Sequence, residues 1–105
     1  MNLQVNINQD GLIQRVAVLG EVDAYTAPKL KEQLVPLAEE KEAQLIIDLS
    51  GVSYIDSTGL GVFIGVLKLT RKHGGSLQLV GLNERVKRLF TITGLDEIIN
   101  ISGGE

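Results

Sequence analysis

The stretch from Ile46 to Val62, IIDLSGVSYIDSTGLGV, decides how this chain folds. Its first part is an apolar run typical of a buried strand, and its second part is an Asp-Ser-Thr-Gly turn that opens a glycine-containing helix pattern. The stretch therefore predicts a strand-to-helix junction that presents hydroxyl groups. Because a helix start carries unpaired backbone N–H groups and the positive end of the helix dipole, it tolerates added negative charge. A serine there can be a helix cap, a nucleophile or a phosphorylation site.

Strand patterns precede this junction. Alternating apolar residues at 3–7 and an apolar run at 13–19 are joined by the turn signal Asp10-Gly11, which predicts a hairpin. Residues 20–23 are expected to connect this hairpin to the first helix. Residues 45–49 are apolar almost throughout, which predicts a central strand covered on both faces.

Helix patterns alternate with the later strands. Thr26 is expected to cap a helix that ends near Lys41. The glycine-containing helix is expected over 58–73, and a third helix over 84–92 behind an asparagine cap. A short strand or helical turn at 98–101 follows the third helix.

With a further strand at 77–82, the order of these patterns is β-β-α-β-α-β-α-β. Because a helix between two strands usually makes them parallel neighbours, the order predicts a single α/β domain over residues 1–105. Its sheet is expected to be mixed but mostly parallel, with the helices packed against it. A chain of 105 residues with 44% hydrophobic content is long enough to bury one core.

Composition removes several classes of function. The chain has no cysteine and one histidine, so neither a disulfide frame nor a cysteine-based metal site is expected. A net charge of −3 argues against nucleic-acid binding, which depends on clustered Lys and Arg. The apolar run at 60–67 is far shorter than the ~20 residues that span a bilayer, and the first residues do not resemble a signal peptide. We therefore expect a cytoplasmic protein with no membrane partner.

Three glycines in the second helix need an explanation, because each costs about 1 kcal/mol relative to alanine. Gly61 and Gly65 lie four residues apart on one helix face, which predicts that they allow close packing against the sheet. Gly59 stands beside the hydroxyls, which predicts that it opens access to them.

Catalytic interpretations of Ser57 need groups that the sequence does not place nearby. His73 is about four helical turns away, and the G-x-S-x-G pattern of serine hydrolases is absent. An aspartic-protease loop has Gly directly after Asp-Ser, whereas Thr58 intervenes here. A phosphate cradle at Gly59 and Gly61 has no P-loop lysine after it. A small nucleotide-binding domain that uses these two glycines is nevertheless the alternative function.

Phosphorylation requires less chemistry from the chain itself. Capping by one Ser, Thr or Asp is worth about 1 kcal/mol, but it does not account for three such residues in a row. A phosphoserine adds about −1.5 to −2 charges and three acceptor oxygens, which a helix start tolerates without a change of fold. Glu21 and Asp23 are expected either to line the same edge of the domain or to be solvated loop charges.

Five short motifs, taken in order, resemble those of STAS domains. More narrowly, the chain resembles the stand-alone bacterial anti-sigma factor antagonists of the general-stress type, over nearly its whole length. The motifs are Gly20-Glu21-Val22-Asp23, Val52 to Val62, Gly74-Gly75-Ser76-Leu77, Val86-Lys87-Arg88-Leu89-Phe90 and Thr93-Gly94-Leu95. The Asp-Ser-Thr-Gly-Leu-Gly core of the second motif is the most specific part of the resemblance.

The resemblance implies a partner-switching protein rather than an enzyme, without a cofactor and monomeric when free. In such systems the unphosphorylated antagonist binds an anti-sigma factor and so frees the sigma factor. The anti-sigma factor is also a serine kinase that phosphorylates the serine after the aspartate, here Ser57, and a PP2C-type phosphatase restores the free form. The residues to which the resemblance assigns partner binding are Asp23, Asp56, Ser57, Thr58, Gly59 and Gly61.

Overall fold

A β-hairpin forms one edge of the sheet. In the computed structural model, which describes residues 3–102, β1 (Leu3–Asp10) pairs antiparallel with β2 (Ile13–Val22). Gly11 turns the chain with a φ of +63°, a conformation that suits glycine, so the hairpin prediction is confirmed. β2 continues through Gly20 to Val22, however, where the sequence predicted a connection. Register shifts in its second half let the strand bend while it stays paired with the next strand.

The other strands are parallel and are joined through helices, in the sheet order β1-β2-β3-β4-β5. The strands are β3 (Gln44–Ile55), β4 (Ser76–Val80) and β5 (Asn100–Ser102). The helices are α1 (Ala27–Ala38), α2 (Ser57–Lys72) and α3 (Glu84–Ile92), and a 3-10 turn at Leu95–Glu97 precedes β5. The predicted α/β order and the mixed, mostly parallel sheet are thus confirmed within residues 3–102. The predicted domain limits at residues 1 and 105 lie outside the described residues.

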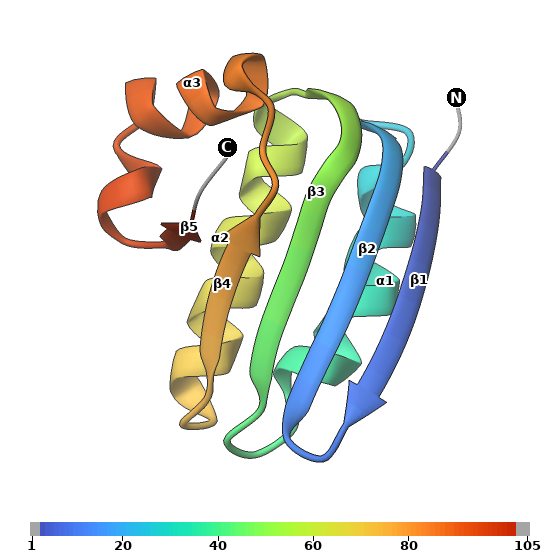
Figure 1. The fold of residues 1–105 in the computed structure, drawn as a ribbon, viewed down its shortest axis with the longest axis vertical. Coiled ribbons are helices and arrows are strands. Elements are labelled where there is room, and N and C mark those ends of the chain that lie inside the picture. Colours follow the sequence, from blue (N-terminus) through green and yellow to red (C-terminus); the bar gives the residue numbers. More distant parts are fainter. Residues whose placement is uncertain (1–2, 103–105) are drawn as a thin grey trace.

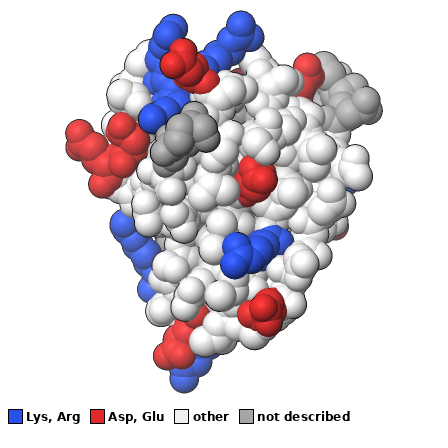
Figure 2. All heavy atoms as spheres, in the orientation of Figure 1, with Lys and Arg blue, Asp and Glu red and all other residues white. Residues whose placement is uncertain are grey.

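Helices α1 and α2 cover one face of the sheet, as Figure 1 shows. Connections between parallel strands are right-handed by strong preference, and the strands follow one another in a single direction across the sheet, so successive helices fall on the same side. The opposite face is open, and Figure 2 shows it as largely uncharged. The expectation that residues 45–49 are covered on both faces was therefore wrong, and Ile46 and Asp48 are only half-buried.

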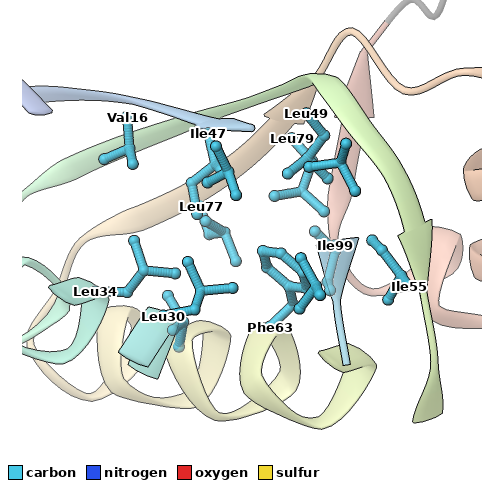
Figure 3. Close-up of a cluster of buried hydrophobic side chains, with 14 of the residues drawn as sticks. Val16, Leu30, Leu34, Ile47, Leu49, Ile55, Phe63, Leu77, Leu79 and Ile99 are labelled. Atoms are coloured by element: carbon cyan, nitrogen blue, oxygen red, sulfur yellow. The ribbon is translucent and has the colours of Figure 1, made fainter. Parts of the chain in front are cut away.

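The core lies between the sheet and these helices (Figure 3). Leu30 of α1 and Phe63 of α2 are fully buried in one cluster with Ile47 of β3 and Leu79 of β4. Complete burial of a side chain of this size stabilises the fold by about 1.5–3 kcal/mol. The apolar face of the first helix is buried, although α1 ends at Ala38 rather than near Lys41.

The ends of α2 and α3 depend on local capping residues. Asn83 Oδ1 accepts a hydrogen bond from the N–H of Val86 at 2.8 Å, so the predicted asparagine cap of α3 is confirmed. After α2, Gly74 adopts a φ of +77°, and the N–H of Gly75 donates to the carbonyl oxygen of Thr70 at 2.7 Å. Within residues 3–102 no helix has the length and hydropathy needed to cross a membrane.

Candidate functional site

The predicted site residues gather where β2 and β3 end. Val22 and Ile55 are paired at the ends of these strands, and the N–H of Asp56 donates to the carbonyl oxygen of Val22 at 3.1 Å. Asp23 and Asp56 each follow one of these paired residues. The turn before α1 and the start of α2 therefore share one edge of the sheet, which brings Asp23 to the same edge as Ser57.

Asp56, rather than Ser57, caps α2. Asp56 Oδ1 accepts a hydrogen bond from the N–H of Gly59 at 3.0 Å, and its backbone is extended as an N-cap requires. Ser57 is the first residue of the helix and is exposed, as is Thr58. Within residues 3–102 the Ser57 hydroxyl has no hydrogen-bond partner. The capping interpretation of Ser57 is therefore wrong, and its hydroxyl is available to a partner.

Hydrolysis by Ser57 would need a general base close to its hydroxyl, and His73 is too far away to serve as that base. His73 follows the last residue of α2, a helix of 16 residues that is about 24 Å long at 1.5 Å per residue. A serine nucleophile needs a base within hydrogen-bond distance of its hydroxyl. The described residues also contain no group of three or more His, Asp or Glu side chains able to hold a metal ion.

Asp23 organises the turn that precedes α1. Its Oδ1 accepts hydrogen bonds from the N–H groups of Thr26 at 3.0 Å and Tyr25 at 2.9 Å. These bonds, above all the one from Thr26, lower the pKa of Asp23 below its ordinary value because they favour the charged form. The Thr26 hydroxyl donates to the carbonyl oxygen of Glu21 at 2.7 Å and caps no N–H group of α1, so the predicted side-chain cap is wrong. Asp23 is thus more than a solvated loop charge, because it holds this turn together.

The three glycines of α2 have roles opposite to those predicted. Gly59 is buried, and a Cβ there would lie 2.6 Å from Cγ1 of Val22 and 2.8 Å from the carbonyl oxygen of the same residue. A Cβ at Gly61 or Gly65 would meet nothing within 4 Å, and both residues are exposed. Packing therefore requires Gly59, whereas Gly61 and Gly65 open the outer side of the helix. A spacing of four residues shows that two residues share a helix face, but not which neighbour that face meets.

The exposed glycines line a groove between α1 and α2, which we call the α1–α2 groove. Its volume is about 640 Å³, and Thr58 lines it beside the phosphorylation candidate Ser57. The α1 wall of this groove was not predicted from the sequence. The available signal was the four-residue spacing of Ala27, Lys31 and Val35 along that helix.

The groove also bears on the nucleotide alternative. Gly59 is buried, so of the two glycines of the expected cradle only Gly61 is accessible. Both lie inside regular helix rather than in a loop that wraps around phosphates. Among the described residues that line the groove, Lys31 is the one cation that a nucleotide would meet.

Comparisons with known proteins agree with the motif pattern. The model of the STAS domain family matches residues 4–104. The anti-sigma-B factor antagonist of Bacillus subtilis (strain 168) is 55% identical over 102 residues, which cover 97% of this chain and 93% of that protein. The anti-sigma-B factor antagonist of Staphylococcus epidermidis is 41% identical over 104 residues, which cover 99% of this chain and 96% of that protein. The crystal structure of an anti-sigma factor antagonist from Mycobacterium paratuberculosis matches with a TM-score of 0.85 at 26% identity, over 95% of this chain and 85% of that one.

Proposed function

The chain belongs to the STAS domain family, and from that premise we propose that it is an anti-sigma factor antagonist that works by partner switching. Unphosphorylated, it binds an anti-sigma factor and so releases the sigma factor. The anti-sigma factor, acting as an ATP-dependent serine kinase, phosphorylates Ser57 and the complex separates. A PP2C-type phosphatase then removes the phosphate. The chain itself acts as a binding protein rather than an enzyme, as a cytoplasmic monomer between its partners.

The observation that carries this proposal is the exposed and unbonded side chain of Ser57. Its side chain is exposed at the first position of α2, and Asp56 already supplies the cap. A kinase can therefore modify the hydroxyl without breaking a hydrogen bond within residues 3–102. The unpaired N–H groups of the first helical turn and the helix dipole stabilise a phosphate there, so we expect the fold to stay unchanged.

A phosphate at Ser57 is expected to oppose binding through charge. Asp23 and Asp56 already place two carboxylates at this edge, and a phosphate adds about −1.5 to −2 charges. A partner that packs closely against this edge meets repulsion and must also remove water from the phosphate. A loss of about 3–4 kcal/mol changes the affinity several hundredfold.

The α1–α2 groove is the surface that we assign to the anti-sigma factor. Gly61 and Gly65 each destabilise the helix by about 1 kcal/mol, although no contact within the described domain requires a glycine at either position. Side chains of a partner that approach the helix backbone closely would offset this cost. Thr58 joins the groove to Ser57, so a partner seated in the groove reaches the phosphorylation site.

The test uses the chain with its cognate anti-sigma factor and ATP. Wild type is expected to bind, to accept phosphate on Ser57 and to dissociate. Ser57→Ala is expected to bind and stay bound, and Ser57→Glu to bind at least about tenfold more weakly.

Ser76→Ala is the matched control, because it removes an exposed serine hydroxyl at the start of β4, beyond the other end of α2. We expect this variant to accept phosphate on Ser57 and to dissociate as wild type does. Mass spectrometry that finds the phosphate elsewhere, or equal binding of the phosphorylated and unphosphorylated forms, would contradict the proposal.

One observation favours the alternative of a nucleotide-binding domain, namely that Gly61 is accessible and shares its groove with Lys31. This alternative predicts measurable affinity for ATP or GTP that Gly61→Leu removes and Ser57→Ala leaves unchanged. Isothermal titration calorimetry with each nucleotide tests this alternative, and the absence of binding would rule out a nucleotide-binding function.

A further inference from the structure

A buried hydroxyl lies behind the turn that carries Asp23. The side chain of Thr26 is only 6% exposed. Its Oγ1 donates to the carbonyl oxygen of Glu21 at 2.7 Å and accepts a hydrogen bond from the N–H of Asp23 at 2.9 Å. A buried hydroxyl is costly unless it is hydrogen-bonded, so both bonds favour a single position of this side chain. Thr26 therefore holds the backbone on both sides of Val22.

The same turn fixes the carboxylate of Asp23. Its Oδ1 accepts hydrogen bonds from the N–H groups of Tyr25 and Thr26, and the Thr26 hydroxyl lies 3.2 Å from this oxygen. Within residues 3–102, the other carboxylate oxygen, Oδ2, has no hydrogen-bond partner. The turn thus holds one oxygen of Asp23 in place and leaves the second one for a donor from outside the domain.

This turn adjoins both parts of the proposed binding surface. Ala24, the residue after Asp23, lines the α1–α2 groove. The carbonyl oxygen of Val22, the residue before Asp23, accepts a hydrogen bond from the N–H of Asp56, and Ser57 follows Asp56. A partner seated in the groove and in contact with Ser57 therefore lies next to the free oxygen of Asp23.

The order of the Asp23 carboxylate before binding affects the affinity for such a partner. A mobile side chain must be ordered on association, which costs free energy, whereas a side chain that is already fixed avoids most of this cost. The Thr26 hydroxyl closes the turn from Glu21 to Asp23, so the hydrogen bonds to the carboxylate depend on it. The lowered pKa of Asp23 agrees with this order, because it reflects hydrogen bonds to the charged form.

We propose that Thr26 is a positioning residue for anti-sigma binding. Its hydroxyl holds the carboxylate of Asp23 in place, so that Oδ2 accepts a hydrogen bond from the anti-sigma factor seated in the α1–α2 groove. Thr26 itself is buried and acts only through Asp23. This inference rests on the proposed function, which assigns the groove to the anti-sigma factor.

The test measures the affinity of the unphosphorylated full chain for its cognate anti-sigma factor, by isothermal titration calorimetry without ATP. Thr26→Val keeps the shape of the side chain but removes both hydrogen bonds of the hydroxyl, and it is expected to bind about fivefold more weakly than wild type. Thr26→Ser keeps the hydroxyl and is expected to stay within about twofold of wild type. Should Thr26→Val fail to fold, Thr26→Ala takes its place with the same expectation.

A double-mutant cycle shows whether Thr26 acts through Asp23. Asp23→Ala is expected to weaken binding at least about tenfold. In the Asp23→Ala background, Thr26→Val is expected to change the affinity by less than about twofold, because the group that it positions is gone. An NMR titration is expected to show a higher pKa of Asp23 in Thr26→Val than in wild type, since the loosened turn gives up hydrogen bonds to the charged carboxylate.

Thr70→Val is the matched control. Thr70 is also a buried threonine, 1% exposed, and its hydroxyl donates to the carbonyl oxygen of Leu67 at 2.8 Å. It lies in the last turn of α2, about 20 Å along the helix from Ser57 at 1.5 Å per residue. We expect Thr70→Val to bind the anti-sigma factor within about twofold of wild type.

Three results overturn the inference. Thr26→Val binds like wild type or leaves the pKa of Asp23 unchanged; Thr26→Ser binds as weakly as Thr26→Val; or Thr26→Val weakens binding by the same factor with and without the Asp23 carboxylate. Wild type alone reports on the proposed function: if it neither binds the anti-sigma factor nor takes phosphate on Ser57, the proposed function fails and this inference fails with it.

Discussion

The inner and outer sides of α2 carry the same residue type for opposite reasons. On the inner side, Gly59 lets the helix approach β2 so closely that a Cβ would overlap Val22. On the outer side, Gly61 and Gly65 line the α1–α2 groove, where a Cβ would meet nothing. The described fold thus requires one of these glycines and is weakened by the other two. We attribute the outer pair to the proposed binding of the anti-sigma factor in the α1–α2 groove.

The largest expected effect is that of Gly59→Ala on the inner side. The added Cβ would overlap a backbone carbonyl oxygen, which cannot rotate away as a side chain can. Overpacking of this kind costs about 3 kcal/mol, and the gain in helix propensity returns about 1 kcal/mol. We expect the free energy of unfolding to fall by about 2 kcal/mol in a urea titration followed by circular dichroism. Unchanged stability would mean that the helix lies further from β2 than the structure shows.

The next largest effect on stability is expected at Asp56, which is the N-cap of α2. Asp56→Ala removes the acceptor for the N–H of Gly59 and is expected to cost about 1 kcal/mol in the same titration. Asp56→Asn keeps a side-chain oxygen at the cap, so we expect it to lower the free energy of unfolding by only a few tenths of a kcal/mol. Equal losses in the two variants would show that the charge, and not the hydrogen bond, stabilises the helix start.

On the outer side, Gly61→Ala and Gly65→Ala are each expected to raise the free energy of unfolding by about 0.5–1 kcal/mol. The added methyl groups meet open space, so only the helix propensity changes. The same substitutions are expected to weaken binding of the anti-sigma factor, which isothermal titration measures. A variant that gained stability and kept full affinity would separate the outer glycines from partner binding.

The smallest effect concerns the turn that leads into the α1 wall of the groove. Hydrogen bonds lower the pKa of Asp23 in the folded state, so its charge stabilises the fold above the ordinary pKa of aspartate, and this contribution disappears as the pH falls through the folded value. Asp23→Asn keeps the acceptor oxygen but has no charge to lose. We expect the Tm of wild type to exceed that of the variant near pH 6, and the difference to shrink below about pH 4. A difference that stays constant down to pH 3 would show that the charge of Asp23 plays no part.

Local chemistry made the order of the elements predictable. Gly11 and Gly74 adopt positive φ at a hairpin and a helix end, and Asn83 caps α3. Each of these devices acts over a few residues, so it is visible in the sequence. The longer apolar patterns then distinguish strands from helices.

The candidate site was predictable only in part. The exposed Ser57 hydroxyl follows from its place at the start of a helix. The cap was harder to assign, because Asp56, Ser57 and Thr58 are all capping residues and only the geometry shows which one bonds to Gly59. The same holds for the turn before α1, where the Thr26 hydroxyl bonds to the carbonyl oxygen of Glu21 instead of capping the helix, and the carboxylate of Asp23 bonds to the N–H of Thr26.

By itself, the sequence determined the succession of strands and helices and the hydroxyl at their central junction, because hydrophobic periodicity and turn residues act between near neighbours in the chain. Only the tertiary structure decided that Gly59 meets the sheet, that Gly61 faces a groove, and that one face of the sheet stays open. These features depend on how α2 is rotated against β2 and α1, and that rotation is set by contacts between segments far apart in the sequence.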